Sequence, residues 1–586
     1  MKVFWFAALI LAASGCATHP RAKRVIVLGV DGMDPAFLER HWDQLPNARR
    51  LRDEGGLARL GTTTPPQSPV AWSTFITGLD PEQHGIFDFV RRDPSTGQPA
   101  SSFAESLPPR FQLAAGPYVL PLSGARVRLL RRGRAFWELL AARGIPVTLM
   151  RLPVNYPPLP SGEALAGMGT PDLEGTFGTF TYYTDDPLET PGEVPGGRIV
   201  GMAVEGGRVR LPIDGPPHPL RRDGRLLQAE ALVDIDADAG ALRCRTGGRD
   251  YILKRGEWSP WIRVRFPFGP GSLSGMFRLY AKELGPAVRI YRSPLNIDPA
   301  DPAMPLSNPS GFSRELEERI GPYGTLGIRE DTAAVRQNVL TREEYLEQSR
   351  LIFGEDMALL GDCLNRFRGG LLFFYFSEVD QNSHLLWGRF EDELLRTYRE
   401  VDRAIGMVRR RAPDAALIVM SDHGFASFDK SVNLNTWLRD QGYGDRARAM
   451  GLNAVYVTPG PDHDRDVTEI ALKLRGLVDP VTGARVVEQV AVHSGAPEIT
   501  AGYARGYRAS WETGLGETPA AGVIQANTDA WIGDHCMAAD EVPGVLLGTR
   551  RPVVSAPSLE DLPVTILGEY GIGPAPGMTG RRLYRE

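Results

Sequence analysis

The sequence predicts an α/β protein in which a central, mostly parallel sheet lies between helices and an inserted, mainly-β cap interrupts the core. Three uninterrupted apolar runs indicate strands that are buried on both faces, as in a parallel sheet. Each run ends at or shortly before an acidic side chain. The runs are residues 25–30, 371–376 and 417–420, and the polar side chains that follow them are Asp31, Asp380, Asp422 and His423. Because ligands gather beyond the carboxyl ends of such strands, we expect a metal site at that sheet edge.

The first part of the core is expected over residues 24–186, where strand and helix patterns alternate. An amphipathic stretch begins at Phe136 and stops at Gly144, and the apolar run 147–150 reads as the next strand. Residues 187–330 change to short alternating segments with many Gly and Pro turns, which predicts the β-rich cap. Residues 331–586 return to helix and strand alternation, so we expect the second part of the core there. Within it, residues 394–408 carry apolar side chains at three- and four-residue spacing, which predicts a helix with one buried face.

Composition limits the function classes. The chain has 586 residues, of which 42% are hydrophobic, so it can bury a large core and more than one structural unit. Its 66 basic and 71 acidic residues leave no basic excess, which disfavours nucleic-acid binding. The basic run 126–132 is interpreted as a solvated helix face.

The N-terminus predicts export. Lys2 precedes an apolar stretch over residues 3–13, which is too short to span a bilayer as a mature helix and indicates a signal peptide over residues 1–16. Ser14 and Gly15 before Cys16 resemble the lipobox of bacterial lipoproteins. This resemblance implies a lipid anchor on Cys16 and a location in the cell envelope, facing the periplasm or the exterior. The alternative is a plain cleaved signal with an incidental cysteine.

Two short motifs carry candidate metal ligands. Asp422 and His423 end a predicted strand, and Gly424 lets the backbone turn sharply away. Upstream, Asp380 and His384 are four residues apart, so both lie on one face if this segment is helical and can share a cation. A structural capping arrangement is the alternative for that pair. Its position directly after an apolar strand favours metal binding.

A third motif covers residues 68–78 and continues through residues 81–86. Taken with Asp31, Asp380, His384 and the segments 422–424 and 533–535, it makes the chain resemble the alkaline phosphatase superfamily, in its type I phosphodiesterase/nucleotide pyrophosphatase branch. The five motifs span almost the whole mature chain, and only the cap lacks one. The resemblance implies an alkaline-phosphatase-like core.

The resemblance also implies two divalent ions, usually zinc, with manganese or magnesium as alternatives. Asp31, Asp422 and His423 would hold the first ion, with the Ser68 hydroxyl as a further ligand and as the nucleophile. Asp380, His384 and His535 would hold the second ion. A phosphoseryl intermediate on Ser68 would form and then be hydrolysed by water.

Ser68 departs from the family pattern. The better-known nucleotide pyrophosphatases carry threonine there and, three residues later, an asparagine that hydrogen-bonds the phosphoryl group; here that later residue is Ala71. Another donor must therefore serve, or the preferred substrate differs. Thr64 is the alternative nucleophile, and a helix N-cap before Pro69 is the alternative role for Ser68.

Other polar residues near these motifs are assigned non-ligand roles. His84 is expected to make a structural hydrogen bond, and His493 is expected to be a surface or loop histidine. The segment around His535 matches the family's final ligand segment, and Asp534 is either a hydrogen-bond acceptor for the His535 imidazole or a turn residue. We expect the loop over residues 169–178 to border the site.

Together these features predict an exported, lipid-anchored hydrolase that cleaves phosphodiester or nucleotide pyrophosphate bonds in a small-molecule substrate. A phosphomonoesterase of the same superfamily is the nearest alternative. A catalytically silent metal-binding scaffold of the envelope is the alternative from another class. Sulfatases of this superfamily need a Cys-x-Pro-x-Arg context, or serine in place of the cysteine, and no cysteine of this chain stands in such a segment.

Overall fold

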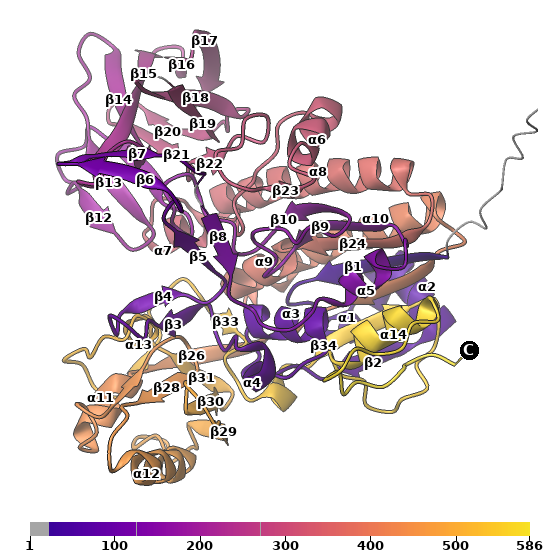
Figure 1. The fold of residues 1–586 in the computed structure, drawn as a ribbon. Coiled ribbons are helices and arrows are strands. Elements are labelled where there is room, and N and C mark those ends of the chain that lie inside the picture. Colours follow the sequence, from indigo (N-terminus) through magenta and orange to yellow (C-terminus); the bar gives the residue numbers. More distant parts are fainter. Residues whose placement is uncertain (1–22, 125, 270, 586) are drawn as a thin grey trace, which may run out of the picture.

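The computed structural model describes residues 23–124, 126–269 and 271–585 (Figure 1). Its centre is an eight-stranded mixed sheet with the strand order β2-β34-β25-β1-β24-β9-β10-β23. The strands are β1 (Arg24–Val30), β2 (Leu57–Leu60), β9 (Val147–Leu152), β10 (Glu163–Ala166), β23 (Ser307–Asn308), β24 (Gly370–Phe376), β25 (Ala416–Met420) and β34 (Gly544–Gly548). The five strands from β25 to β10 pair in parallel, and the remaining pairs at the two sheet edges are antiparallel. The predicted α/β class with a central sheet is therefore confirmed.

The three predicted apolar runs form the adjacent strands β25, β1 and β24. In register, Val30 of β1 lies beside Phe376 of β24, and Gly29 lies beside Met420 of β25. The strands therefore end together, and the residues that follow them reach the same edge of the sheet.

Helices cover both faces of this sheet (Figure 1). One face packs against α1 (Pro35–Arg40), α2 (Pro46–Gly55), α6 (Phe312–Ile320), α8 (Arg342–Arg366), α9 (Glu378–Leu386) and α10 (Glu391–Arg411). The other face packs against α3 (Ser68–Thr77), α5 (Phe136–Ala141) and α14 (Asp561–Glu569). Side chains alternate between these two cores along β1, with Ile26 and Leu28 on one side and Val25 and Val27 on the other. Burial on both faces explains why these strands read as continuous apolar runs.

Local sequence explains the longest helices. The first turn of α10 is acidic and its last turn is basic, which complements the helix dipole, and its apolar stripe over residues 394–408 is buried as predicted. Helix α8 starts with a capping box in which Thr341 and Glu344 satisfy each other's backbone N–H groups. No helix among the described residues combines the length and the apolar character that crossing a membrane requires.

A β-rich region with its own apolar core projects from this sheet (Figure 1). Its strands are β11 (Phe180–Thr184), β12 (Gly192–Val194), β13 (Gly197–Gly201), β14 (Arg208–Pro217), β15 (Leu226–Asp236), β16 (Ala241–Thr246), β17 (Arg249–Lys254), β18 (Ile262–Phe268), β19 (Gly271–Phe277), β20 (Leu279–Leu284), β21 (Val288–Arg292) and β22 (Asn296–Ile297). They form a five-stranded, a four-stranded and a three-stranded sheet. The domain boundaries at residues 187 and 330 stay predictions.

Short hairpins occupy the stretch between α4 (Pro81–His84) and α5. They are built from β3 (Val90–Arg92), β4 (Pro99–Ser101), β5 (Ala104–Leu107), β6 (Gln112–Ala115), β7 (Tyr118–Pro121) and β8 (Arg126–Leu129). The interpretation of residues 126–132 as a helix face is wrong, because residues 126–129 form β8. Arg126 and Arg128 are exposed whereas Val127 and Leu129 are half-buried, which is the two-residue period of a strand.

A second small unit follows β25 in the chain (Figure 1). It contains β26 (Ala426–Val432), α11 (Leu434–Asp440), β27 (Ala447–Ala449), β28 (Ala454–Val457), α12 (His463–Arg475), β29 (Val487–Val492), β30 (Ile499–Tyr503), β31 (Gly506–Ala509), α13 (Trp511–Gly514), β32 (Ile524–Ala526) and β33 (Gly533–Asp534). Strand β33 pairs with β26, and the chain then returns to the central sheet at β34. This return places the last predicted ligand segment beside the edge at which β1, β24 and β25 end.

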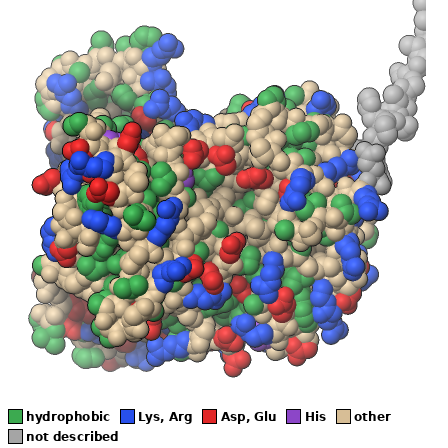
Figure 2. Space-filling model, turned by 90° about the horizontal axis from the view of Figure 1, so that it is seen from below, with side chains coloured by type: hydrophobic (Ala, Val, Ile, Leu, Met, Phe, Trp, Pro, Cys, Tyr) green, Lys and Arg blue, Asp and Glu red, His purple; other side chains and the backbone are tan. Residues whose placement is uncertain are grey.

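The predicted signal peptide and Cys16 lie outside the described residues, so they stay predictions. On the face shown in Figure 2, Lys and Arg side chains are interspersed with Asp and Glu side chains.

Candidate metal centre

The predicted ligands converge at one edge of the central sheet. Asp31 follows β1, Asp422 and His423 follow β25, Asp380 and His384 lie on α9, His535 follows β33, and Ser68 is the first residue of α3. All seven are buried. Within the described residues, ligand atoms lie within 4.8 Å of one another in two groups, Asp31 with Asp422 and His423, and Asp380 with His423 and His535. Five separate chain segments are therefore folded into one polar cluster.

Distances place His423 between the two groups. Its Nε2 lies 3.4 Å from the Asp31 carboxylate, 3.3 Å from that of Asp422 and 3.9 Å from that of Asp380. On the other side, Nε2 of His384 lies 3.5 Å from Asp380, and Nε2 of His535 lies 3.7 Å from the same carboxylate. Asp380 is thus surrounded by three imidazoles.

Backbone carbonyls orient all three imidazoles in the same way. Nδ1 lies 2.9 Å from the Gly533 oxygen in His384, 3.1 Å from the Gly424 oxygen in His423 and 2.8 Å from the Pro66 oxygen in His535. Because a carbonyl oxygen can only accept, each neutral ring carries its proton on Nδ1 and turns the lone pair of Nε2 toward the carboxylates. This is the arrangement in which a histidine binds a metal through Nε2.

Two carboxylate oxygens of the cluster have no hydrogen-bond donor within the described structure. They are Oδ1 of Asp380 and Oδ2 of Asp422, and both atoms are buried. An unpaired buried charge is costly unless a cation or a donor faces it. Imidazole nitrogens and carboxylate oxygens are suitable ligands for zinc and other divalent transition metals. The residues present therefore fit a metal site.

The two oxygens of Asp31 have different environments. Oδ2 accepts hydrogen bonds from the Trp72 indole at 2.8 Å and from the Tyr375 hydroxyl at 2.7 Å, whereas Oδ1 faces Ser68 and His423. Sequence reasoning did not identify Trp72 or Tyr375 as partners of Asp31. The only available signal for Tyr375 was a hydroxyl in an otherwise apolar strand. These two donors leave Oδ1 as the oxygen of Asp31 that faces the cluster.

Electrostatics within the cluster are strongly coupled. Burial, together with the carboxylates of Asp31 and Asp380, raises the pKa of Asp422 well above its usual range. Burial opposes the charged form of His423, but the carboxylates of Asp422, Asp31 and Asp380 outweigh it and raise its pKa to about 10. Burial lowers the pKa of His535 to about 3, and nearby His423 adds to this effect. Positive charge is therefore favoured between the three carboxylates.

Ser68 lies against the first group of ligands. Its Oγ is 3.1 Å from Nε2 of His423 and 3.3 Å from Oδ1 of Asp31. The N-cap of α3 is Gln67, so the capping role considered for Ser68 is not what the structure shows. Ala71 is buried in the apolar core beneath α3 and offers no polar group. Thr64 makes no hydrogen bond or ion pair to the ligand cluster in the part of the chain described.

The remaining polar candidates lie outside the cluster. His84 bonds Thr74 through Nε2 and accepts the Ile86 N–H at Nδ1, which is a structural role. His493 pairs with Glu82.

Asp534 has the turn role rather than the role of acceptor for the imidazole, and the loop over residues 169–178 does not border the cavity beside the cluster. Asp534 accepts the backbone N–H of His535 and pairs with Arg508 at 2.7 Å, so it orients the backbone rather than the imidazole. The loop contributes no lining residue to the cavity beside the cluster and lines a neighbouring one instead.

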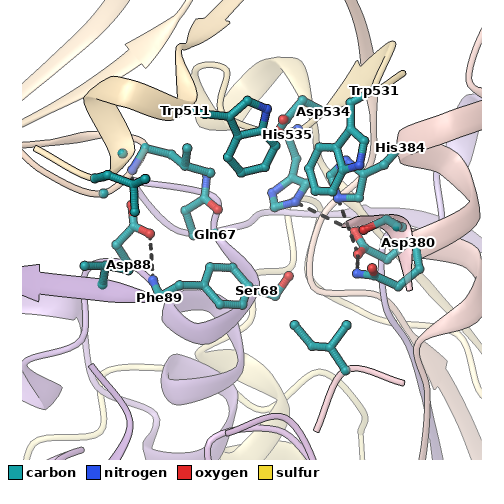
Figure 3. Close-up of a pocket in the computed structure, with 18 residues that line it drawn as sticks. Gln67, Ser68, Asp88, Phe89, Asp380, His384, Trp511, Trp531, Asp534 and His535 are labelled. Atoms are coloured by element: carbon teal, nitrogen blue, oxygen red, sulfur yellow. Dashed lines mark hydrogen bonds and ion pairs between the residues drawn. The ribbon is translucent and has the colours of Figure 1, made fainter. Parts of the chain in front are cut away.

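A cavity of about 250 Å³ opens beside Ser68, Asp380 and His535 (Figure 3). Its wall is mainly apolar and aromatic, and includes Phe89, Ile328, Leu452, Trp511, Leu515 and Trp531. Trp531 stacks on His384 with 3.6 Å between the ring centroids. No lysine or arginine is among the residues that line this cavity. A bound group here would meet flat apolar surfaces next to the cluster of candidate metal ligands.

Comparison with known proteins gives one family. The sequence model of the family described as type I phosphodiesterase / nucleotide pyrophosphatase matches residues 25–162 and 296–510, which is more than half of the chain. The unmatched stretch between them holds β10 to β21. No curated protein sequence matches the chain.

Solved structures with similar folds include phosphonoacetate hydrolase from Sinorhizobium meliloti 1021 in complex with phosphonoacetate, at 14% identity and a TM-score of 0.47. The same enzyme with phosphonoformate has 13% identity and a TM-score of 0.45. Murine ectonucleotide pyrophosphatase / phosphodiesterase 5 has 10% identity and a TM-score of 0.43. Each comparison covers 94% of this chain and 96% of the other.

Proposed function

Because the chain belongs to the type I phosphodiesterase / nucleotide pyrophosphatase family and is therefore a phosphoric ester hydrolase, we propose that it cleaves phosphodiester or nucleotide pyrophosphate bonds through nucleophilic attack by Ser68. The observation that carries this proposal is the position of Ser68 Oγ, 3.1 Å from His423 and 3.3 Å from Asp31. A hydroxyl buried among metal-ligand side chains has no structural purpose in a scaffold. This position therefore favours an enzyme over the silent envelope scaffold.

Two divalent ions, zinc in the first instance, fit the donor set. Asp31, Asp422, His423 and Ser68 would hold one, and Asp380, His384 and His535 would hold the other. When bound, such ions supply Lewis acidity that lowers the pKa of a serine hydroxyl and offsets charge on a phosphoryl group. Manganese and magnesium prefer sites richer in oxygen, so the three imidazoles favour zinc.

The chain's own groups orient the nucleophile. Oδ1 of Asp31 is within reach of the Ser68 hydroxyl and aims it, while Trp72 and Tyr375 hold the other oxygen of Asp31 in place. The deprotonated Oγ attacks phosphorus, the bond to the leaving group breaks with its electron pair, and a phosphoseryl ester results. Water then attacks the same phosphorus, which releases the phosphate product and restores the Ser68 hydroxyl.

The phosphoryl group would lie at the N-terminus of α3, where the helix dipole favours an anion. Val70 and Ala71 donate their backbone N–H groups to the Gln67 carbonyl, and Pro69 has none. The N–H of Ser68 itself is left as the backbone donor in the first turn. It would take the part that the family's asparagine plays, since Ala71 has no donor in its side chain.

Cavity chemistry favours diesters over monoesters. A monoester presents a dianionic phosphate, which is recognised best by arginine or lysine contacts, and the cavity wall has neither. A diester carries one negative charge and a second substituent, and the wall of Phe89, Trp511 and Trp531 suits an apolar or aromatic one. The phosphomonoesterase alternative has no residue in this cavity that favours it.

The proposed location is the bacterial cell envelope, with a lipid anchor on Cys16. Its support is the apolar stretch over residues 3–13 and the small residues before Cys16.

Hydrolysis of three substrates tests the proposed function. Metal-loaded protein is given bis-p-nitrophenyl phosphate, p-nitrophenyl phosphate and a nucleotide diester, with and without a chelator. We expect faster cleavage of the diesters, loss of that cleavage with the chelator, and loss of it in Ser68→Ala. Faster cleavage of the monoester would indicate a phosphatase instead. No turnover of any of the three substrates would favour the scaffold interpretation.

A further inference from the structure

The hairpin formed by β6 and β7 has one face made only of apolar side chains. The strands pair with Leu113 opposite Leu120 and Ala115 opposite Tyr118. Because side chains alternate across a strand, Phe111 and Leu122, which continue the same rows, also point to this side. We call these six side chains, Phe111, Leu113, Ala115, Tyr118, Leu120 and Leu122, the hairpin face.

The hairpin face is open to solvent. The exposed fractions are 63% for Phe111, 61% for Leu113, 58% for Tyr118, 53% for Leu120 and 59% for Leu122. Single exposed apolar residues are common on protein surfaces, but a contiguous row across two paired strands is not. Such a row marks an interaction surface.

Contacts with the β-rich region hold the hairpin in position. Val119 donates its backbone N–H to the Leu220 carbonyl, and the Arg222 N–H reaches the Pro117 carbonyl. The Arg222 guanidinium donates to the Gly116 carbonyl at 2.7 Å. Figure 1 shows β6 and β7 at the left margin of the molecule. The hairpin is therefore braced along its edge. The hairpin face remains exposed, with the Arg221 guanidinium 5.0 Å from the centre of the Tyr118 ring at one end.

The charges around the hairpin are mostly positive; the acid of the neighbouring loop, Asp223, is paired with Arg221. Residues 106–134 contain six arginines and no acidic residue. Arg110 and Arg126 are exposed and form no ion pair in the described structure, and Arg128 pairs with Glu105, which lies just before this stretch. Arg222 and Arg225 from the neighbouring loop are exposed as well. The chain as a whole is slightly acidic, so this concentration of arginine is local.

We propose that the hairpin face inserts into the interfacial layer of an anionic lipid bilayer, with the surrounding arginines on the lipid headgroups. Apolar side chains next to basic ones are the composition that binds such a surface, because burial and charge attraction act together. A second copy of this chain fits less well, since a symmetric contact would bring two arginine-rich stretches together. This contact is separate from the hydrolytic site and from the proposed anchor at Cys16.

A site-specific fluorescent label tests the insertion. In the full chain carrying Cys16→Ser, Leu113→Cys is labelled with an environment-sensitive dye; the other three cysteines are buried. Ile252→Cys is the matched control, because Ile252 is an exposed apolar residue on β17 at 74% exposure. With phosphatidylglycerol vesicles we expect brighter, blue-shifted emission from the label at position 113 and no change at position 252.

Vesicle binding of unlabelled variants measures how much the apolar side chains and the arginines contribute to membrane affinity. Replacing Leu113 and Leu120 together by serine should weaken binding to phosphatidylglycerol vesicles roughly tenfold, and each of Arg110→Gln and Arg126→Gln about fivefold. Ile252→Ser should bind as the wild type does. All variants should hydrolyse soluble bis-p-nitrophenyl phosphate at the rate of the unsubstituted protein, which shows that they are folded.

Two results would overturn the proposal. One is a label at position 113 that does not respond to anionic vesicles. The other is a response at position 113 that needs no vesicles and follows protein concentration, because a second copy would then cover the hairpin face.

Discussion

Replacing Tyr375 by phenylalanine removes one oxygen from the support of Asp31. The Tyr375 hydroxyl donates to Oδ2 of Asp31 at 2.7 Å, and its ring packs edge-on against Trp72. Phenylalanine keeps the ring and its packing, so no cavity larger than the lost hydroxyl is created. Among the residues that the structure describes, the Trp72 indole, at 2.8 Å, is the only other donor to this oxygen. The substitution therefore isolates one hydrogen bond to a metal-ligand carboxylate.

The expected effect is on metal affinity. A hydrogen bond to a charged group contributes about 1.5–3 kcal/mol, and loss of a partner that orients a metal ligand weakens metal binding about 10- to 100-fold. We expect Tyr375→Phe to fall in that range, because Asp31 keeps the Trp72 contact but gains freedom to rotate. Turnover at saturating zinc should decline less than affinity does, since Ser68 is untouched.

Competition between the protein and a chromogenic chelator for zinc measures this effect. Tyr323→Phe is the matched control, because Tyr323 is also fully buried and donates to a carbonyl, that of Ser313, away from the ligand cluster. Zinc affinity of Tyr375→Phe within about threefold of the wild type would refute the reasoning. An equal loss in Tyr323→Phe would assign the effect to general destabilisation instead.

Three further predictions address the nucleophile, the cavity and the anchor. Ser68→Ala should reduce kcat at least about a thousandfold with zinc content unchanged, whereas His384→Ala should lower zinc content as well. Normal turnover of Ser68→Ala would show that Ser68 is not the nucleophile. Asp88 lines the cavity, and burial raises its pKa from 3.8 to about 6 in the folded protein. The folded state then binds this proton more tightly than the unfolded state, so stability falls by about 3 kcal/mol as pH rises from about 4 to about 6. Urea unfolding across that range should show a slope that Asp88→Asn flattens, and an unchanged slope would contradict the shift. Cys16→Ser should move the protein from the membrane to the soluble fraction of cells, and a variant that stays with the membrane would disprove the lipid anchor.

Much of the central fold could be predicted from the sequence, because strands that are buried on both faces appear as continuous apolar runs. Strands β1, β24 and β25 are continuous apolar runs, and the buried stripe of α10 keeps its helical spacing. The β8 strand was misread as a helix face because four residues with exposed arginines are too few to separate a period of two from one of 3.6. The unit built around α12 was not foreseen, since its short strands alternate like those of the core.

For the metal centre, too, the sequence predicted one part and the tertiary structure was needed for the other. By itself the sequence determined which side chains bear the chemistry, since Asp31, Asp422 and His423 stand where predicted strands end. Only the tertiary structure decided how they face one another. The carbonyls of Pro66, Gly424 and Gly533 set the three imidazoles, and Tyr375 and Trp72 select one oxygen of Asp31. Apart from the contact between His423 and Gly424, these contacts join residues far apart in the chain, so no local pattern encodes them. A strand's period shows which face is buried, but only packing shows which atom meets which.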